Sequence, residues 1–336
     1  SGVLFLFLSF VGLREHLINV VPATLKNSIG VGIGLLIAVV GLQWSGMIVD
    51  NPGTLVGMGQ LTSGPVLLSL FGLTVMAILL VLEVQTAILL GIFATTLLGL
   101  ATGMLEYQGL VGPIPSMTPT LFQLDVRGAL HTGMVSIIFV FFFLDLFDTV
   151  GTLIGVTQET GLLRPDGTLP RARWAFLSDA VGTTLGSLLG TSTVTSYVES
   201  ATGISSGART GLANMATGSL LLAAVFFTPL VRMISGGVDP GEGLVLYPVV
   251  APALIIVGCY MLRQIKRIDW DNFEEAIPAF MTIMIIPMTF SITEGIAFGF
   301  ISYTVLKAVT GRFKEVPTLI WVFALLFILR YIFLSH

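Results

Sequence analysis

Charged residues are scarce in this sequence. Only 10% of the 336 residues are Asp, Glu, Lys or Arg, while 54% are hydrophobic. Soluble domains usually carry about 25% charged residues, so the composition excludes an ordinary soluble enzyme. A disordered chain is excluded as well, because disorder requires low hydrophobicity and high net charge. The sequence therefore predicts a protein that is embedded in a membrane.

Cysteine and long runs of basic residues are also in short supply. The one cysteine, Cys259, excludes a disulfide framework and a Cys-rich metal site. A net charge of -4 without a basic run gives no electrostatic footprint for nucleic acid. A zinc protease is excluded because the sequence has no His-Glu-x-x-His motif. We expect neither a metal ion nor another cofactor.

Long hydrophobic runs dominate the chain instead. A spanning helix needs about 20 apolar residues, and runs near this length lie at 28–48, 65–83, 86–103, 131–152, 174–190, 211–234, 244–262 and 316–335. Lipid offers no partners to backbone polar groups, so these runs should be helices. An outer-membrane barrel would instead show alternating segments of about 10 residues. We interpret the shorter run at 3–13 as the end of a spanning helix whose start is missing.

The distribution of basic residues predicts a topology. Lys and Arg cluster in four connections, which the positive-inside rule places in the cytoplasm, whereas residues 49–64 and 235–243 hold none and are expected outside. The region 276–306 lies between two cytoplasmic clusters and is divided by Pro278, Pro287 and Gly295. Two interpretations remain open for it. Either the region is a hairpin of partial spans, or one of the flanking connections has been assigned to the wrong side of the membrane.

A second irregularity follows Gly190. Residues 191–197, TSTVTSY, place β-branched threonines at every second position, which is typical of an extended strand. A strand at membrane depth is tolerated only where protein or a water-filled cavity satisfies its backbone. Interrupted helices of this kind form binding sites near the midplane of secondary transporters.

Acidic residues within hydrophobic runs are the candidate functional groups. Asp145 and Asp148 are three residues apart and share a helical face with Thr152, and Glu199 follows the predicted strand. A charged carboxylate at the bilayer centre costs about 2.5–3.5 kcal/mol and usually marks a substrate or proton path.

Each of these acids also has a purely structural alternative. Ser196 and Glu199 fit a capping box, in which the glutamate serves only the helix start. The aspartates could lie at a helix end that protrudes into water. Asp179, about two turns into a predicted helix, is a further candidate, and whether it is a fourth intramembrane acid is left open. An intramembrane aspartyl protease is not supported, because neither Asp145 nor Asp148 has a G-x-G-D type context.

Three blocks carry a family resemblance. They are LDLFDTVGTLIGV at 144–156, GTSTVTSYVESATGISSGARTGL at 190–212 and IDWDNFEEAIPAFMTIMIIPMTFSITEGIAFGFISY at 268–303. In this order they resemble the AzgA-type adenine, guanine and hypoxanthine permeases of the nucleobase-cation symporter 2 superfamily, and the likeness covers essentially the whole chain.

The resemblance implies an all-α polytopic membrane protein with a UraA-like inverted-repeat transporter fold. That fold has seven plus seven segments, here N-terminally truncated, with a short intramembrane strand before the tenth-segment half-helix. The implied parts are a core-helix end and cytoplasmic loop at 1–27, gate-domain helices at 28–103, core-domain helices at 131–234, gate-domain helices with a broken hairpin at 244–310, and a C-terminal helix at 316–336.

The resemblance also implies a site and an activity. The substrate-binding residues would be Asp145, Asp148, Thr149, Thr193, Thr195 and Glu199, and Asp148 and Glu199 would carry the coupled proton. The implied activity is purine nucleobase:proton symport by alternating access in the cell (plasma or inner) membrane, without enzymatic chemistry. The expected partners are a purine nucleobase, a proton and the lipid bilayer, with a homodimer left open. The alternative is an anion transporter or channel of the same general fold, because helix N-termini attract anions; Glu199 at that terminus argues against it.

Overall fold

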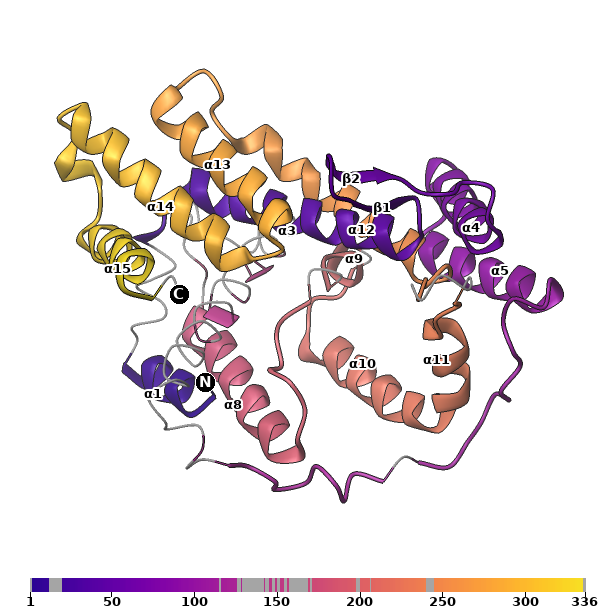
Figure 1. The fold of residues 1–336 in the computed structure, drawn as a ribbon. Coiled ribbons are helices and arrows are strands. Elements are labelled where there is room, and N and C mark those ends of the chain that lie inside the picture. The colour runs from indigo at the N-terminus through magenta and orange to yellow at the C-terminus, as the bar shows by residue number, and fades with distance from the viewer. Residues whose placement is uncertain are drawn as a thin grey trace. The chain divides into compact units, whose positions relative to one another are not determined.

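The computed structural model describes most of the chain. The described residues are 2–11, 20–114, 116–125, 128, 142, 145–146, 149, 152–153, 156, 169, 171–197, 200–205, 207–239 and 245–334. They are mostly helical (Figure 1). Contacts along the chain divide them into two compact units. The first unit comprises Ser1–Gly32, Ser116–Asn214 and Gln264–His336, and the second comprises Ile33–Pro115 and Met215–Arg263. The core and gate boundaries implied by the resemblance remain predictions.

Most of the predicted spans coincide with helices. Among the described residues, four helical stretches are long and apolar enough to cross a membrane, namely α3 (Ala23–Trp44), α4 (Gly64–Val81), Gly211–Ser235 and α14 (Ile292–Val309). The stretch Gly211–Ser235 consists of α10 (Gly211–Ala224), the 3-10 turn η1 (Val225–Phe227) and α11 (Thr228–Ser235). The remaining helical elements are α1 (Gly2–Val11), α5 (Ala87–Ala101), α8 (Ala172–Leu189), α9 (Ser200–Ser205), α12 (Ala251–Met261), η2 (Leu262–Arg267), α13 (Phe273–Thr289), η3 (Phe313–Glu315) and α15 (Thr318–Leu334). The predicted span 131–152 lies largely outside the described residues.

A β-hairpin occupies the connection that was expected only as an external loop. Strands β1 (Ile48–Asn51) and β2 (Leu55–Met58) pair antiparallel, with Ile48 opposite Met58 and Asn51 opposite Leu55. The chain reverses at Pro52 and Gly53, a dipeptide that marks turns. The sequence therefore contained a turn signal here, but the strands are only four residues long and too short for a clear alternation.

In the second unit, α4 packs against both α5 and α12. The Ser69 hydroxyl donates to the carbonyl oxygen of Pro248, just before α12, at 3.2 Å. Small residues allow the close approach, because a Cβ added at Gly91 of α5 would collide with Met76 of α4. The absence of a side chain at Gly91 therefore allows the two helices to pack closely.

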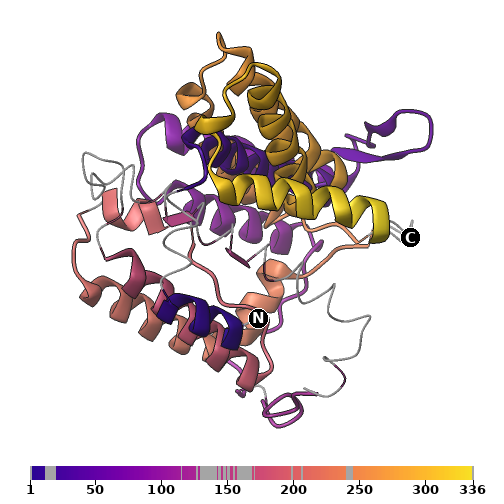
Figure 2. The same cartoon turned by 90° about the vertical axis from the view of Figure 1, so that its left-hand side faces the viewer.

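In the first unit, α1 lies alongside α8, as both views of the ribbon show (Figure 1 and Figure 2). A Cβ added at Gly2 would lie only 2.7 Å from the Thr184 Oγ1. The buried ring of Phe5 stacks on Phe142, with ring centroids 5.0 Å apart. The apolar N-terminal run therefore packs against the elements that carry the candidate acids.

The region 276–306 lies in two consecutive packed helices, α13 and α14, so a hairpin is present, but its arms are longer than the partial spans that were predicted. The side of the membrane on which its flanking connections lie stays a prediction. The arms have 17 and 18 residues, so at 1.5 Å per residue each is about 26 Å long. This length approaches the roughly 30 Å of a bilayer core. Two crossings of this length return the chain to the same side, which fits the basic clusters that flank the hairpin.

The hairpin breaks at a different place from the one expected. Pro278 and Pro287 lie inside α13 without ending it, as membrane helices tolerate when side chains or neighbours satisfy the freed backbone groups. The helix ends at Phe290, whose φ is 51°, and Ser291 then caps α14 by accepting a hydrogen bond from the Glu294 N–H at 3.3 Å. Gly295 lies within α14, so it does not divide the hairpin either.

Gly295 instead controls how closely the two arms pack. A Cβ added there would collide with Ile286 and lie 2.9 Å from the carbonyl oxygen of Thr282. We expect Gly295→Ala to destabilise the protein by about 1–3 kcal/mol, the usual cost of overpacking, measured by unfolding in detergent. Gly218→Ala in α10 is the matched control, since nothing lies within 4 Å of its added Cβ. Equal stability of the two variants would contradict this account.

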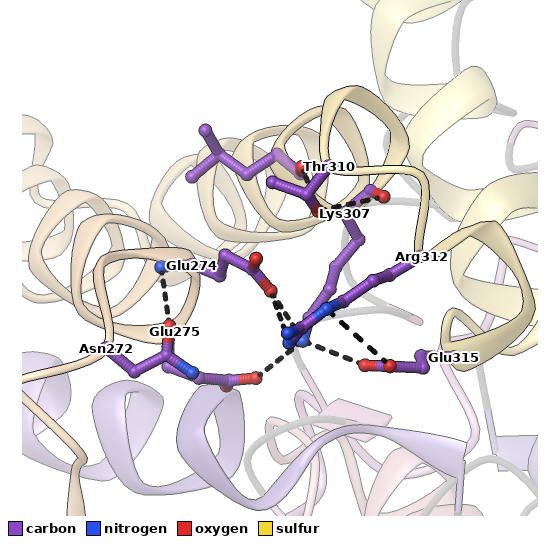
Figure 3. A network of polar contacts seen from close by, with 8 residues as sticks. Asn272, Glu274, Glu275, Lys307, Thr310, Arg312 and Glu315 are labelled. Carbon is purple, nitrogen blue, oxygen red and sulfur yellow. Dashed lines mark hydrogen bonds and ion pairs between the residues drawn. The ribbon is translucent and has the colours of Figure 1, made fainter.

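The open end of the hairpin is fastened by the Lys307 cluster, which consists of Lys307, Glu274, Glu275, Arg312 and Glu315 (Figure 3). The side chain of Lys307 is 5% exposed, and its Nζ lies 3.0 Å from Glu274 Oε2, 3.4 Å from Glu275 Oε1 and 3.1 Å from Glu315 Oε2. Arg312 Nη1 is 3.2 Å from Glu274 Oε2. The cluster joins the first turn of α13 to the last turn of α14 and to η3.

The other end of α14 is fastened to α15. Glu294 accepts hydrogen bonds from Arg330 Nη2 at 2.6 Å and from the Tyr331 hydroxyl. Between the two ends, Phe300 of α14 packs its ring against Phe323 and Phe327 of α15. Polar contacts therefore hold α14 at both ends, and aromatic packing holds its middle.

Candidate functional site

Three polar side chains of the first predicted acidic helix are enclosed in the first unit. Asp145, Thr149 and Thr152 are helical, and they are 5%, 0% and 5% exposed. Spacings of four and three residues place them on one helical face. The burial of Asp145 contradicts the alternative in which this acid protrudes into water. Asp148, between them in sequence, lies outside the described residues.

Helix α8 provides a second enclosed acid. Asp179 is 8% exposed, and its Oδ1 accepts a hydrogen bond from the Thr149 hydroxyl at 3.1 Å. Asp179 is therefore buried, while its place within the membrane stays a prediction. The contact also links α8 directly to the helical residues at 145–156, which spacing along the sequence could not reveal.

Residues 191–197 interrupt the helices, as predicted, but they do not form a strand. Local and side-chain hydrogen bonds replace the strand ladder. The Thr191 and Thr195 hydroxyls donate to the next carbonyl along the chain, each at 3.2 Å, and the Val194 carbonyl accepts from Thr183 of α8 at 2.8 Å. Hydroxyl side chains compete with regular backbone pairing in this way, so the alternation of threonines overstated the strand.

The predicted site residues are therefore only partly placed together. Asp145 and Thr149 are buried beside α8, and the half-buried Thr193 and Thr195 lie in the segment 191–197 that α8 also contacts. Glu199 lies outside the described residues, and so does its part in the predicted capping box. The meeting of Asp148 with Glu199 stays a prediction.

Thr183 is the residue that the sequence analysis missed. It is 1% exposed and connects α8 to the segment 191–197. A signal was present, since Thr183 stands between Gly182 and Gly186, and small residues next to a hydroxyl favour close approach and hydrogen bonding within membranes.

The enclosed groups suit binding by hydrogen bonds. Carboxylates accept hydrogen bonds, or donate when protonated, and threonine hydroxyls do both. Within the described residues, no group of three His, Cys, Asp or Glu side chains is arranged to hold a metal ion. The carboxylates and hydroxyls in this part of the structure are groups that can hydrogen-bond to a polar molecule.

Comparison with known proteins identifies the family. The permease family matches residues 1–298. The guanine/hypoxanthine permease PbuG of Bacillus subtilis is 43% identical over 338 residues, which cover 100% of this chain and 74% of that protein. The adenine permease AdeP of Escherichia coli is 41% identical over 330 residues, covering 98% and 72%. The guanine/hypoxanthine permease PbuO of Bacillus subtilis is 38% identical over 334 residues, covering 98% and 75%.

These matches confirm the resemblance found in the three sequence blocks, and the apolar helices fit an integral membrane protein. They also agree with the expectation that the protein is a transporter and not an enzyme. The chain belongs to the permease family.

Proposed function

We propose that this protein is a purine nucleobase:proton symporter of the cell membrane that works by alternating access. The names of similar permeases support the substrate class, since PbuG is a guanine/hypoxanthine permease and AdeP is an adenine permease. Proton coupling and the alternation of core and gate domains belong to the proposal. Its starting point in the structure is the enclosed polar site on α8.

The observation that carries the proposal is the convergence of two elements on this helix. Thr149 contacts Asp179 at 3.1 Å, and Thr183 contacts the Val194 carbonyl at 2.8 Å. Asp145 is buried on the same helical face as Thr149. Purine bases present ring N–H donors and nitrogen or oxygen acceptors along their edges. Buried carboxylates and hydroxyls match that pattern, and a site built to hydrogen-bond its ligand discriminates strongly against analogues that lack the bonding groups.

The proton would bind to one of the acids, with Asp148 and Glu199 as the proposed carriers. A base that hydrogen-bonds to a carboxyl group changes the affinity of that group for a proton, and by linkage the proton changes the affinity for the base. Movement of one domain against the other would then carry base and proton together.

Uptake of labelled adenine, guanine and hypoxanthine tests this proposal. Cells that lack endogenous purine uptake and express the full-length permease should accumulate at least one purine, and a protonophore should abolish accumulation. Asp148→Ala and Glu199→Ala should each abolish it too. Unchanged uptake in both variants would end the assignment of these acids, and transport of sulfate in place of purines would favour the anion transporter.

A further inference from the structure

One face of α8 carries the contacts to both halves of the proposed site. The buried residues Phe176, Asp179, Thr183 and Gly186 follow one another at spacings of three, four and three, which places them on one face of the helix. Asp179 contacts Thr149 at 145–156, and one turn later Thr183 contacts residues 191–197. This face therefore determines how far apart the two elements lie.

The contact at Thr183 is a close fit. Its hydroxyl donates to the Val194 carbonyl at 2.8 Å. A Cβ added at Gly186 would lie 2.8 Å from Thr191 Oγ1 and 3.1 Å from Val194 Cγ2, and one at Gly182 would lie 3.3 Å from Val194 Cγ1. The two glycines thus leave room for the segment to lie directly on α8, where the hydroxyl can reach a carbonyl of the main chain.

The start of the segment is fixed as well. Helix α8 ends at Gly190, whose φ is 80°, and the Thr191 N–H donates to the Gly186 carbonyl at 3.0 Å. This is the hydrogen bond of a Schellman motif, which favours glycine at the left-handed position. The segment is therefore held at Thr191 and again at Val194. Thr193 lies between these points, and Thr195 lies just beyond them.

We propose that Thr183 is a positioning residue that determines the affinity of the site for its purine. The inference rests on the proposed function. Thr183 does not contact the purine itself; it fixes Thr193 and Thr195 relative to Asp145 and Thr149. A purine that bonds to both elements requires a defined distance between them, and small displacements of binding groups weaken recognition substantially.

Uptake kinetics of three variants test this role. Thr183→Val keeps the shape of the side chain but leaves the Val194 carbonyl without its hydroxyl donor. It should raise the KM for purine severalfold, in line with the loss of one hydrogen bond to a part-buried carbonyl, and change the maximal rate much less. Thr183→Ser should restore a KM near the wild-type value. Thr184→Val is the matched control, because the Thr184 hydroxyl bonds only within α8, to the Ala180 carbonyl at 2.7 Å.

Gly186→Ala offers a second route if Thr183→Val folds poorly. The added methyl group would push Thr191 and Val194 away from α8 while Thr183 keeps its hydroxyl, so the KM should rise again. A KM equal to that of the wild type in both variants would overturn the proposal. So would a Thr184→Val variant with the same rise in KM as Thr183→Val.

A chemical readout separates this inference from the substrate assignment. Thr193→Cys, placed in a Cys259→Ser background, should react with a small thiol reagent at a rate that Thr183→Val changes severalfold and Thr184→Val does not. An unchanged rate would overturn the positioning role without any purine in the assay. Absence of purine uptake in the wild type would instead overturn the proposed function, while the change in labelling rate would still support the anchoring of residues 191–197.

Discussion

Replacing Asp145 with asparagine should lower purine uptake at least tenfold. Asp145 is 5% exposed, and asparagine keeps its size while it removes the charge. Hydrogen bonds to charged groups contribute about 1.5–3 kcal/mol, and every 1.4 kcal/mol corresponds to a factor of ten in affinity. Loss of one such bond to the base is therefore sufficient for the expected decrease.

Initial rates of labelled purine uptake, normalised to the amount of permease in the membrane, measure this effect. Asp50→Asn is the control, because Asp50 is exposed on β1 and belongs to the second unit. Asp50→Asn should transport like the wild type. If Asp145→Asn also did so at equal protein levels, Asp145 would have no part in substrate binding.

Replacing Lys307 with methionine should cause the largest loss of stability, about 3 kcal/mol. Methionine has a similar length, but it leaves the carboxylates of Glu274 and Glu275 without the ammonium group that lies within 3.0 Å and 3.4 Å of them. Hydrogen bonds to charged groups contribute about 1.5–3 kcal/mol, and Glu275 would lose its ion-pair partner, whereas Glu274 keeps Arg312. Chemical unfolding in detergent micelles would measure the change.

Two comparisons isolate the contribution of Lys307. The Arg312 side chain is 51% exposed, so Arg312→Met should cost less than about 1 kcal/mol, as expected for an exposed ion pair. Addition of Glu274→Gln and Glu275→Gln to Lys307→Met should recover part of the lost stability, because no uncompensated carboxylate then remains in α13. Equal losses of stability for Lys307→Met and Arg312→Met would contradict the claim that the largely buried Lys307 contributes more to stability than the exposed Arg312.

The helices of this protein could be predicted because hydrophobicity and length are local properties. Runs such as 65–83 and 316–335 contain so few polar groups that a membrane helix satisfies their backbones without reference to the rest of the chain. The break in the α13–α14 hairpin was harder to place. Proline normally ends a helix, but α13 continues through Pro278 and Pro287 and ends at Phe290, because packing and side-chain bonds outweigh local preference.

Some residues of the candidate site could likewise be predicted from the sequence, and others could not. Asp145 could be found from the sequence because an acid in an apolar run is costly, and therefore conspicuous, whereas Thr149 was predicted only from the family resemblance. Thr183 could not, since a threonine in a membrane helix is common and its importance depends entirely on which carbonyl it meets. The strand predicted at 191–197 was wrong for a related reason. Its threonine hydroxyls donate to neighbouring carbonyls, and its Val194 carbonyl accepts from Thr183 of α8, so these side chains take the place of a strand ladder.

A helical membrane permease with acids among its apolar residues could be inferred without coordinates, because composition and the three family blocks are properties of the chain alone. The contacts of Thr149 with Asp179, of Thr183 with Val194 and of Lys307 with three carboxylates became visible only in the folded structure. Each of these contacts brings together residues from different elements. Their energies depend on distance and burial, which are set by packing and not by position along the chain.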